Sequence, residues 1–249
     1  MAHRGDLSYY LPTDGGTALG TAPTNTGTYS AGTGRPDLIV FDWDQTLWNS
    51  WNFHVKTIGR TAASLGVEPP SEEQVAASFI VPFVKHVGNL FPHNPDEAME
   101  LYIGLYIAHI KDSGVLFPGV ADTLTALKDA GYLLALFSDK RQKYGRMELE
   151  ISGVGSLFDH VRFLDSRRPY KPNPMGLLQV LDALAMEPHN AMYVGDSPVD
   201  IQCAKRCGMA GAAALWGSLN RDALIHEGPT HICQGISDLL DVLGALGPA

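Results

Sequence analysis

Two carboxylates follow a short apolar segment near the start of the regular part of the chain. The segment Leu38–Phe41 is apolar throughout and leads directly into D-W-D-Q-T at residues 42–46. A run of this kind is typical of a strand buried on both faces in a parallel sheet. Ligands of open parallel sheets bind beyond the carboxyl ends of the strands. Asp42 and Asp44 could therefore act there as a nucleophile and a general acid or base, although a D-x-D pair could instead belong to a solvated turn.

Other polar residues also stand directly after predicted strands or at the start of predicted helices. They are Ser138, Lys171, Asp196 and Asp200. Each has an ordinary structural explanation as a turn residue, a surface charge or a helix cap. Because all of them occur at positions that a parallel sheet brings to one edge, a shared site is the better interpretation.

The donor types at these positions indicate phosphoryl chemistry. Carboxylates from two strand ends suit Mg²⁺, which takes a few carboxylates together with waters and phosphate oxygens. A hydroxyl, a lysine and backbone N–H groups suit the remaining phosphoryl oxygens. The chain has no G-x-x-x-x-G-K-[ST] loop, no G-x-G-x-x-G after its first strand and no G-x-S-x-G. These absences disfavour a P-loop NTPase, a dinucleotide enzyme and a serine hydrolase.

Alternating strands and helices must position these residues. Further strand-like runs are predicted at 132–137, 160–163, 191–194, 210–216 and 230–233. Helices are predicted between them, with Gly131 as a C-terminal cap and Pro174 and Pro198 at helix starts. This order predicts an α/β fold, a Rossmann-like doubly wound parallel sheet.

The segment from Trp48 to Val115 interrupts the alternation. It carries a capping box at residues 71–74 and a helix start at Asn94-Pro95, with apolar residues at helical spacing. We expect an all-helical insertion at 48–115. The predicted core then comprises 37–47 and 116–249, and the Gly- and Thr-rich residues 1–36 are predicted to form a flexible tail.

The four motifs together resemble those of the haloacid dehalogenase-like (HAD) superfamily. The match runs from D-x-D-x-T at 42–46 through the serine and lysine motifs to G-D-x-x-x-D at 195–200. The helical insertion resembles the α-helical cap of subclass I, in the layout of phosphoglycolate phosphatase-like members. Two residues depart from the usual pattern: Gln45 stands where glycine is common, and Trp43 is bulkier than the usual aliphatic residue.

The resemblance implies Mg²⁺-dependent hydrolysis of a small phosphomonoester, phosphoglycolate-like, through an aspartyl-phosphate. It implies that Asp42 is the nucleophile and Asp44 the general acid and base. Thr46 would position the loop, and Ser138 and Lys171 would hold the phosphoryl group. The implied metal ligands are the Asp42 carboxylate, the Asp44 backbone carbonyl and Asp196, with Asp200 supporting the metal from behind.

Two alternatives remain at this point. A phosphomutase would use the same core motifs. A phospho-accepting signalling domain would also pair acids, a hydroxyl and a lysine around Mg²⁺, but needs neither Asp44 nor a cap.

Composition and net charge limit the classes of partner that we expect for the protein. The chain has 249 residues, of which 45% are hydrophobic and 18% charged, the balance of a soluble globular protein. Its net charge of −9 disfavours binding to nucleic acid through a broad basic surface. We expect a small phosphorylated metabolite as partner, and no membrane, because no stretch approaches a membrane span. The three cysteines form no disulfide framework, so we expect a cytoplasmic protein.

Overall fold

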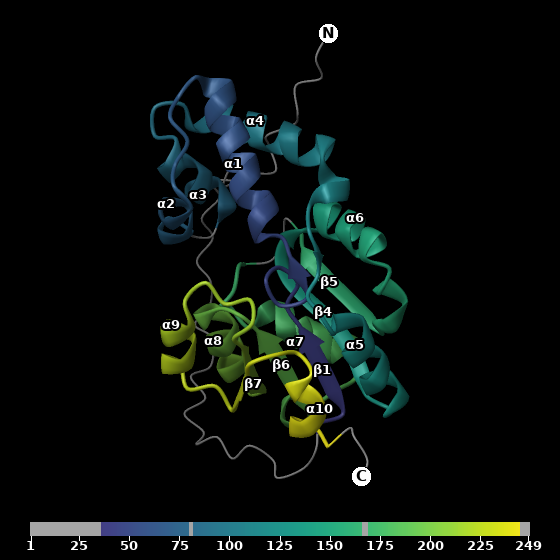
Figure 1. Cartoon of the computed structure of the whole chain (residues 1–249). Helices are drawn as coiled ribbons and strands as arrows, with labels where there is room; N and C mark the ends of the chain where they lie inside the picture. The colour runs from purple at the N-terminus through teal and green to yellow at the C-terminus, as the bar shows by residue number, and fades with distance from the viewer. Residues whose placement is uncertain (1–35, 80–81, 166–168, 245–249) are drawn as a thin grey trace.

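The computed structural model describes residues 36–79, 82–165 and 169–244. The predicted tail at 1–36 lies outside the described residues except for Pro36. Within these ranges a six-stranded sheet forms the centre of the molecule, in the order β5-β4-β1-β6-β7-β8, and every neighbouring pair is parallel. The predicted Rossmann-like α/β core is confirmed (Figure 1).

The strands lie close to their predicted positions. Their bounds are β1 Leu38–Phe41, β4 Leu133–Arg141, β5 His160–Leu164, β6 Ala191–Gly195, β7 Ala210–Ala214 and β8 His231–Cys233. β4 continues beyond its predicted end at Phe137, with a shift in register between Phe137 and Arg141. Because the ladder is irregular there, side chains at 138–140 can turn from the sheet faces toward its carboxyl edge.

Helices cover both faces of the sheet. They are α5 Val120–Asp129, α6 Gln142–Ser152, α7 Met175–Ala183, α8 Pro198–Cys207, α9 Arg221–His226 and α10 Asp238–Val242. Alternate residues of β1 divide between the two cores: Ile39 and Phe41 pack in the cluster of α5, α6 and α10, and Leu38 and Val40 in that of α7 and α8. The apolar run is thus buried on both sides, as its composition predicts.

The insertion after β1 forms a separate helical layer beyond the carboxyl edge of the sheet (Figure 1). It contains α1 Trp51–Leu65, α2 Glu72–Ala77, α3 Phe83–Leu90 and α4 Pro95–Ala108, which share an aromatic-rich core. The predicted capping box is present at the start of α2. The insertion is not wholly helical, because β2 Trp48–Asn49 pairs antiparallel with β3 Val115–Leu116 where it leaves and rejoins the core. These two-residue strands are too short to give a recognisable period in sequence. We call residues 48–115 the cap.

None of the helices within the described ranges is long and apolar enough to cross a membrane.

Candidate active site

The loop after β1 turns sharply at the carboxyl edge of the sheet. The backbone N–H groups of residues 46–48 all donate to the Trp43 carbonyl, which closes the turn. Asp42 and Thr46 are buried, and the Thr46 hydroxyl donates to Asp196 Oδ1 at 2.9 Å. The loop is therefore tied directly to the end of β6.

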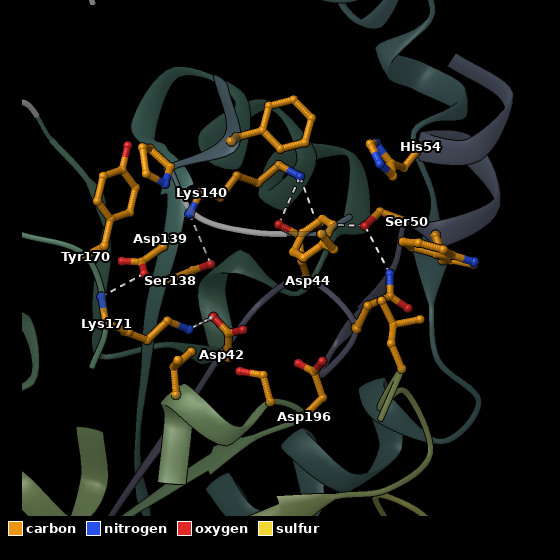
Figure 2. A pocket seen from close by; sticks show the side chains of 18 of the residues that line it. Asp42, Asp44, Ser50, His54, Ser138, Asp139, Lys140, Tyr170, Lys171 and Asp196 are labelled. Carbon is orange, nitrogen blue, oxygen red and sulfur yellow. Dashed lines mark hydrogen bonds and ion pairs between the residues drawn. The ribbon is translucent and has the colours of Figure 1, made fainter. Parts of the chain in front are cut away.

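Asp42 lies against a buried lysine that follows β5. Lys171 Nζ is 3.0 Å from Asp42 Oδ1 (Figure 2). The same atom is 2.6 Å from Asp200 Oδ1. Burial alone would lower the pKa of Lys171, but the adjacent Asp200 and Asp42 carboxylates outweigh it and hold that pKa well above its usual value. Lys171 is thus a permanent cation between two carboxylates. Sequence reasoning missed Tyr193, whose hydroxyl also contacts Lys171 and Asp200, at 3.2 Å each.

Three buried carboxylates converge beside this lysine. One oxygen from each of Asp42, Asp196 and Asp200 lies within 4.8 Å of the others. Burial raises the pKa of Asp42 to about 7, with Lys171 lowering it and Asp200 raising it. Burial and the neighbouring Asp200 and Asp42 hold the pKa of Asp196 well above its usual range. Lys171 is one cation beside three carboxylates, so the cluster needs further positive charge when all three are deprotonated.

The oxygens of this cluster differ in how they are satisfied. Asp42 Oδ1 is contacted by Lys171 Nζ at 3.0 Å, and Asp196 Oδ1 accepts from the Thr46 hydroxyl at 2.9 Å. Asp200, by contrast, has both oxygens engaged, one by Lys171 and Tyr193 and the other by Ser197. The two adjacent buried acids Asp42 and Asp196, with oxygens that converge, fit a hard divalent cation such as Mg²⁺.

Asp44 points away from this cluster toward the cap. Its carboxylate accepts from Lys140 Nζ at 2.9 Å and from the Ser50 hydroxyl at 2.7 Å (Figure 2). Lys140 was not among the residues predicted from sequence. Its place two residues after Ser138, at the same strand end, is the signal that could have identified it.

Ser138 and Asp139 lie where the irregularity of β4 brings them to the sheet edge. Ser138 is buried, and its hydroxyl accepts from the Lys140 backbone N–H at 3.3 Å. Asp139 Oδ2 accepts from the backbone N–H of Lys171 at 2.9 Å, which holds the two loops together. All seven residues predicted for the site therefore lie around one carboxyl edge of the sheet. Of the four predicted metal residues, Asp42, Asp196 and Asp200 bring their carboxylates together, and the Asp44 carboxylate lies outside that cluster.

Behind Lys140 lies a buried acid that no sequence pattern indicates. Glu148 on α6 is 0% exposed and forms an ion pair with Lys140 at 2.8 Å. It also accepts from Trp43 Nε1 at 2.8 Å and from the hydroxyl of Tyr106. Trp43 belongs to the loop after β1 and Tyr106 to α4 of the cap. Glu148 thus joins the loop after β1, β4 and the cap through one carboxylate.

The sequence profile of the haloacid dehalogenase-like hydrolases matches residues 39–214, which include every residue of this site. The chain belongs to that family. Phosphoglycolate phosphatase of Aquifex aeolicus is 29% identical over 215 residues, covering 83% of this chain and 96% of its own. Phosphoglycolate phosphatase 1 of Pseudomonas aeruginosa is 30% identical over 216 residues, with coverages of 82% and 79%.

Further similar proteins are named as a pyrophosphatase, a phosphoglycolate phosphatase and a β-phosphoglucomutase. Pyrophosphatase PpaX of Anoxybacillus flavithermus is 28% identical over 208 residues, covering 84% of this chain and 97% of its own. A predicted phosphoglycolate phosphatase from Haemophilus somnus superposes with a TM-score of 0.75 at 25% identity, covering 85% of this chain and 99% of that one. A putative β-phosphoglucomutase from Thermotoga maritima shares the fold with a TM-score of 0.73 at 21% identity, covering 84% and 99%.

In this HAD-like hydrolase, Gln45 has a structural role that explains part of its departure from glycine. Its φ of 60° lies in the left-handed region, where glycine is favoured. The side-chain amide of Gln45 is oriented so that its oxygen faces donors. In that orientation Gln45 Oε1 accepts from the backbone N–H groups of Ser50 and Trp51, at 3.2 and 2.9 Å. Ser50 does not cap α1 with its own side chain, so Gln45 satisfies the first turn of that helix in its place.

We expect Gln45→Gly to be more stable than Gln45→Ala by about 1 kcal/mol, because both lose the amide contacts but only alanine keeps the strain of the left-handed backbone. Urea unfolding midpoints of the two variants measure the difference. An alanine variant as stable as the glycine variant would contradict the strain.

A cavity of about 770 Å³ connects the sheet edge with the cap. Its floor includes Asp42, Asp44, Ser138, Lys171 and Asp196. Its opposite wall comes from the cap, where Trp51, His54, Phe79, Phe83 and Tyr102 are among the lining residues. A substrate bound at the sheet edge would therefore extend its leaving group into the cap.

Proposed function

We propose that this HAD-like phosphatase hydrolyses a small phosphomonoester through an aspartyl-phosphate on Asp42, with Mg²⁺ as cofactor. The observation that carries the proposal is the buried Asp42 carboxylate, which opens onto the cavity between a cation on one side and two further carboxylates on the other. A structural ion pair would not need two additional buried acids, whose mutual repulsion destabilises the fold.

In the first half-reaction, an Asp42 oxygen attacks phosphorus, and the bond between phosphorus and the ester oxygen breaks. Lys171, at 3.0 Å from Asp42, is placed to balance the negative charge of the phosphoryl oxygens. Ser138 lines the same floor and supplies a hydroxyl to them. Thr46 holds the loop against Asp196, which keeps Asp42 in position for attack.

Asp44 transfers the protons. Its carboxyl donates a proton to the departing alcohol oxygen and then removes one from the water that attacks the aspartyl-phosphate. That second step releases inorganic phosphate and restores the Asp42 carboxylate. Ser50 and Lys140 orient the Asp44 carboxylate toward the cap side of the cavity, where the leaving group would lie.

The proposed magnesium site uses the carboxylates of Asp42 and Asp196 and the backbone carbonyl of Asp44. Asp200, whose oxygens are already engaged, would support the site by holding Lys171. When bound, Mg²⁺ supplies positive charge that stabilises the phosphoryl oxygens during transfer.

The names of the curated relatives suggest a phosphoglycolate-like substrate, and the same names make phosphoglycolate the first compound to test. A small phosphorylated metabolite also fits a site that a cap covers. We propose neither nucleic acid nor a membrane surface as a partner.

The proposal predicts Mg²⁺-dependent release of phosphate from an aryl phosphate, together with an effect of Mg²⁺ on stability. Release should stop in excess chelator and return when Mg²⁺ is restored. Mg²⁺ should also raise the melting temperature, and raise it more at about pH 8 than at about pH 5, because it binds the deprotonated carboxylates. Phosphate assays and melting curves at both pH values measure these effects.

The direction of this pH dependence follows from the raised pKa values of the buried acids Asp42 and Asp196. Folding without metal raises the pKa of Asp42 from 3.8 to about 7. The stability that its proton contributes is therefore complete below the lower value and is lost as the pH rises through the higher one. Full phosphate release in chelator would overturn the cofactor assignment. Conversion of a sugar phosphate to its isomer without phosphate release would favour the phosphomutase alternative.

A further inference from the structure

The part of the cavity that lies in the cap is aromatic and uncharged. It includes Trp51, Phe79, Phe83, Met99, Tyr102 and Ile103. None of the described cap residues that line the cavity is an aspartate, glutamate, lysine or arginine. We call this part of the cavity the aromatic chamber.

His54, which lines the aromatic chamber, and its neighbour His86 are arranged as neutral groups. His54 Nε2 lies 2.9 Å from Nε2 of His86, and His54 Nδ1 lies 2.9 Å from the Tyr102 hydroxyl. His86 Nδ1 is 3.2 Å from the hydroxyl of Ser78. Two nitrogens this close need one donor and one acceptor, so protonating both rings would set two N–H groups against each other. Burial and the neighbouring His86 lower the pKa of His54 to about 3.

Aromatic rings surround His54 on several sides. The ring centroids of Phe83 and Phe79 lie 5.5 and 6.0 Å from that of His54, both edge to face. Trp51 lies 5.6 Å from His54 and 6.4 Å from Phe79. Phe79 is 49% exposed although it lines the chamber, so an apolar ligand would cover surface that now faces solvent.

The cations that line the cavity come from the core and not from the cap: Lys140, Arg141 at the end of β4, and Lys171. The two lysines are already engaged. Lys171 pairs with Asp42 and Asp200, and Lys140 pairs with Asp44 and Glu148. A carboxylate extending into the aromatic chamber would lose its water without meeting a cation from the described cap residues. A glycolate leaving group would also leave most of the 770 Å³ empty of substrate.

From this wall we infer that the substrate is the phosphomonoester of an uncharged aromatic alcohol, whose ring occupies the aromatic chamber while its phosphate lies at Asp42 and Lys171. The inference rests on the proposed phosphatase activity and specifies its leaving group. A nucleoside is a less suitable occupant, because its ribose hydroxyls and base edges need polar partners that this wall supplies sparsely.

Two phosphate esters of primary alcohols test the inference, because they differ mainly in the ring. We expect kcat/KM for phenylpropyl phosphate to exceed that for propyl phosphate by about ten- to hundredfold, the gain from burying a phenyl ring. Phosphoglycolate and a nucleoside monophosphate are assayed beside them, and both should be poorer substrates than phenylpropyl phosphate. Phosphoglycolate or the nucleotide as the best of the four would overturn the assignment.

Phe79→Ala should reduce the ratio of kcat/KM for phenylpropyl phosphate to that for propyl phosphate by at least about threefold, because the substrate ring loses its contact with the half-buried Phe79 ring. Ile107→Ala is the matched control, because Ile107 is an exposed residue of α4 that does not line the cavity. Its ratio should equal that of the unmodified protein. An unchanged ratio in Phe79→Ala would remove Phe79 from the leaving-group site.

A binding measurement separates this inference from the phosphatase proposal. Phenylpropanol carries no phosphate, and its saturation-transfer NMR signal with the protein should exceed that of propanol and weaken in Phe79→Ala. If phenylpropanol binds but no ester is hydrolysed, the phosphatase proposal fails and the aromatic chamber stands. If esters are hydrolysed without preference for the ring and phenylpropanol does not bind, the inference about the leaving group is wrong.

Discussion

Asp42→Asn should lower kcat by on the order of 10⁴-fold or more, because it removes the nucleophile that the aspartyl-phosphate mechanism requires. An asparagine amide has nearly the same shape as the carboxylate but is a far weaker nucleophile. Turnover of an aryl phosphate in saturating Mg²⁺ measures the loss. Mass spectrometry of the purified variant excludes deamidation back to aspartate.

The stability of this variant distinguishes loss of chemistry from loss of fold. Burial raises the pKa of Asp42 to about 7, so its charged form destabilises the metal-free protein at higher pH. Asparagine removes that charge, and we expect the metal-free variant to melt no more than slightly below the unmodified protein at about pH 8. Full activity in a variant shown to carry asparagine would refute Asp42 as nucleophile.

Glu148→Gln should destabilise the protein by about 2–3 kcal/mol, because it removes the buried negative charge that pairs with Lys140 and leaves the more exposed Asp44 as the acid that contacts that lysine. Glu148 receives Lys140, Trp43 and Tyr106 on its two oxygens. Glutamine keeps one acceptor oxygen for Lys140 and Trp43, and its NH₂ group then faces the Tyr106 hydroxyl, which must change from donor to acceptor. Urea unfolding measures the change, which corresponds to a fall in melting temperature of roughly 5–10 °C.

Glu150→Gln provides the matched control. Glu150 lies on the same helix two residues further along, but it is exposed, and its side chain forms no such network with the residues that the structure describes. Its substitution should change the free energy of unfolding by no more than about 0.5 kcal/mol. Equal stability of the Glu148 and Glu150 variants would show that the three contacts of Glu148 contribute little to the fold.

This network also gives Trp43 a physical reason to differ from the aliphatic residue usual at its position. Its indole N–H donates to Glu148, and its ring stacks on Trp48 with centroids 5.5 Å apart. An aliphatic side chain has no donor for the carboxylate. The larger residue in the loop after β1 is therefore matched by a buried acid on α6.

Most of the fold follows from local patterns in the chain. Apolar runs such as Leu38–Phe41 predict buried strands, and capping residues predict helix starts at Ser71 and Asn94. The two-residue strands β2 and β3 were missed because their pairing joins residues 48 and 116, far apart in sequence. The extension of β4 past Phe137 was missed because polar residues in an irregular ladder have no alternating pattern.

What the sequence by itself determined is the set of residues at strand ends, from Asp42 to Asp200. Parallel strands bring their carboxyl ends to one edge, so order along the chain is enough to place those residues together. Only the tertiary structure decided that Lys140 holds Asp44, that Glu148 joins the cap to the loop, and that the cap wall is aromatic and neutral. Those properties depend on which side chains meet when separate helices pack, and the periodicity of a single segment specifies which face is buried but not its partner.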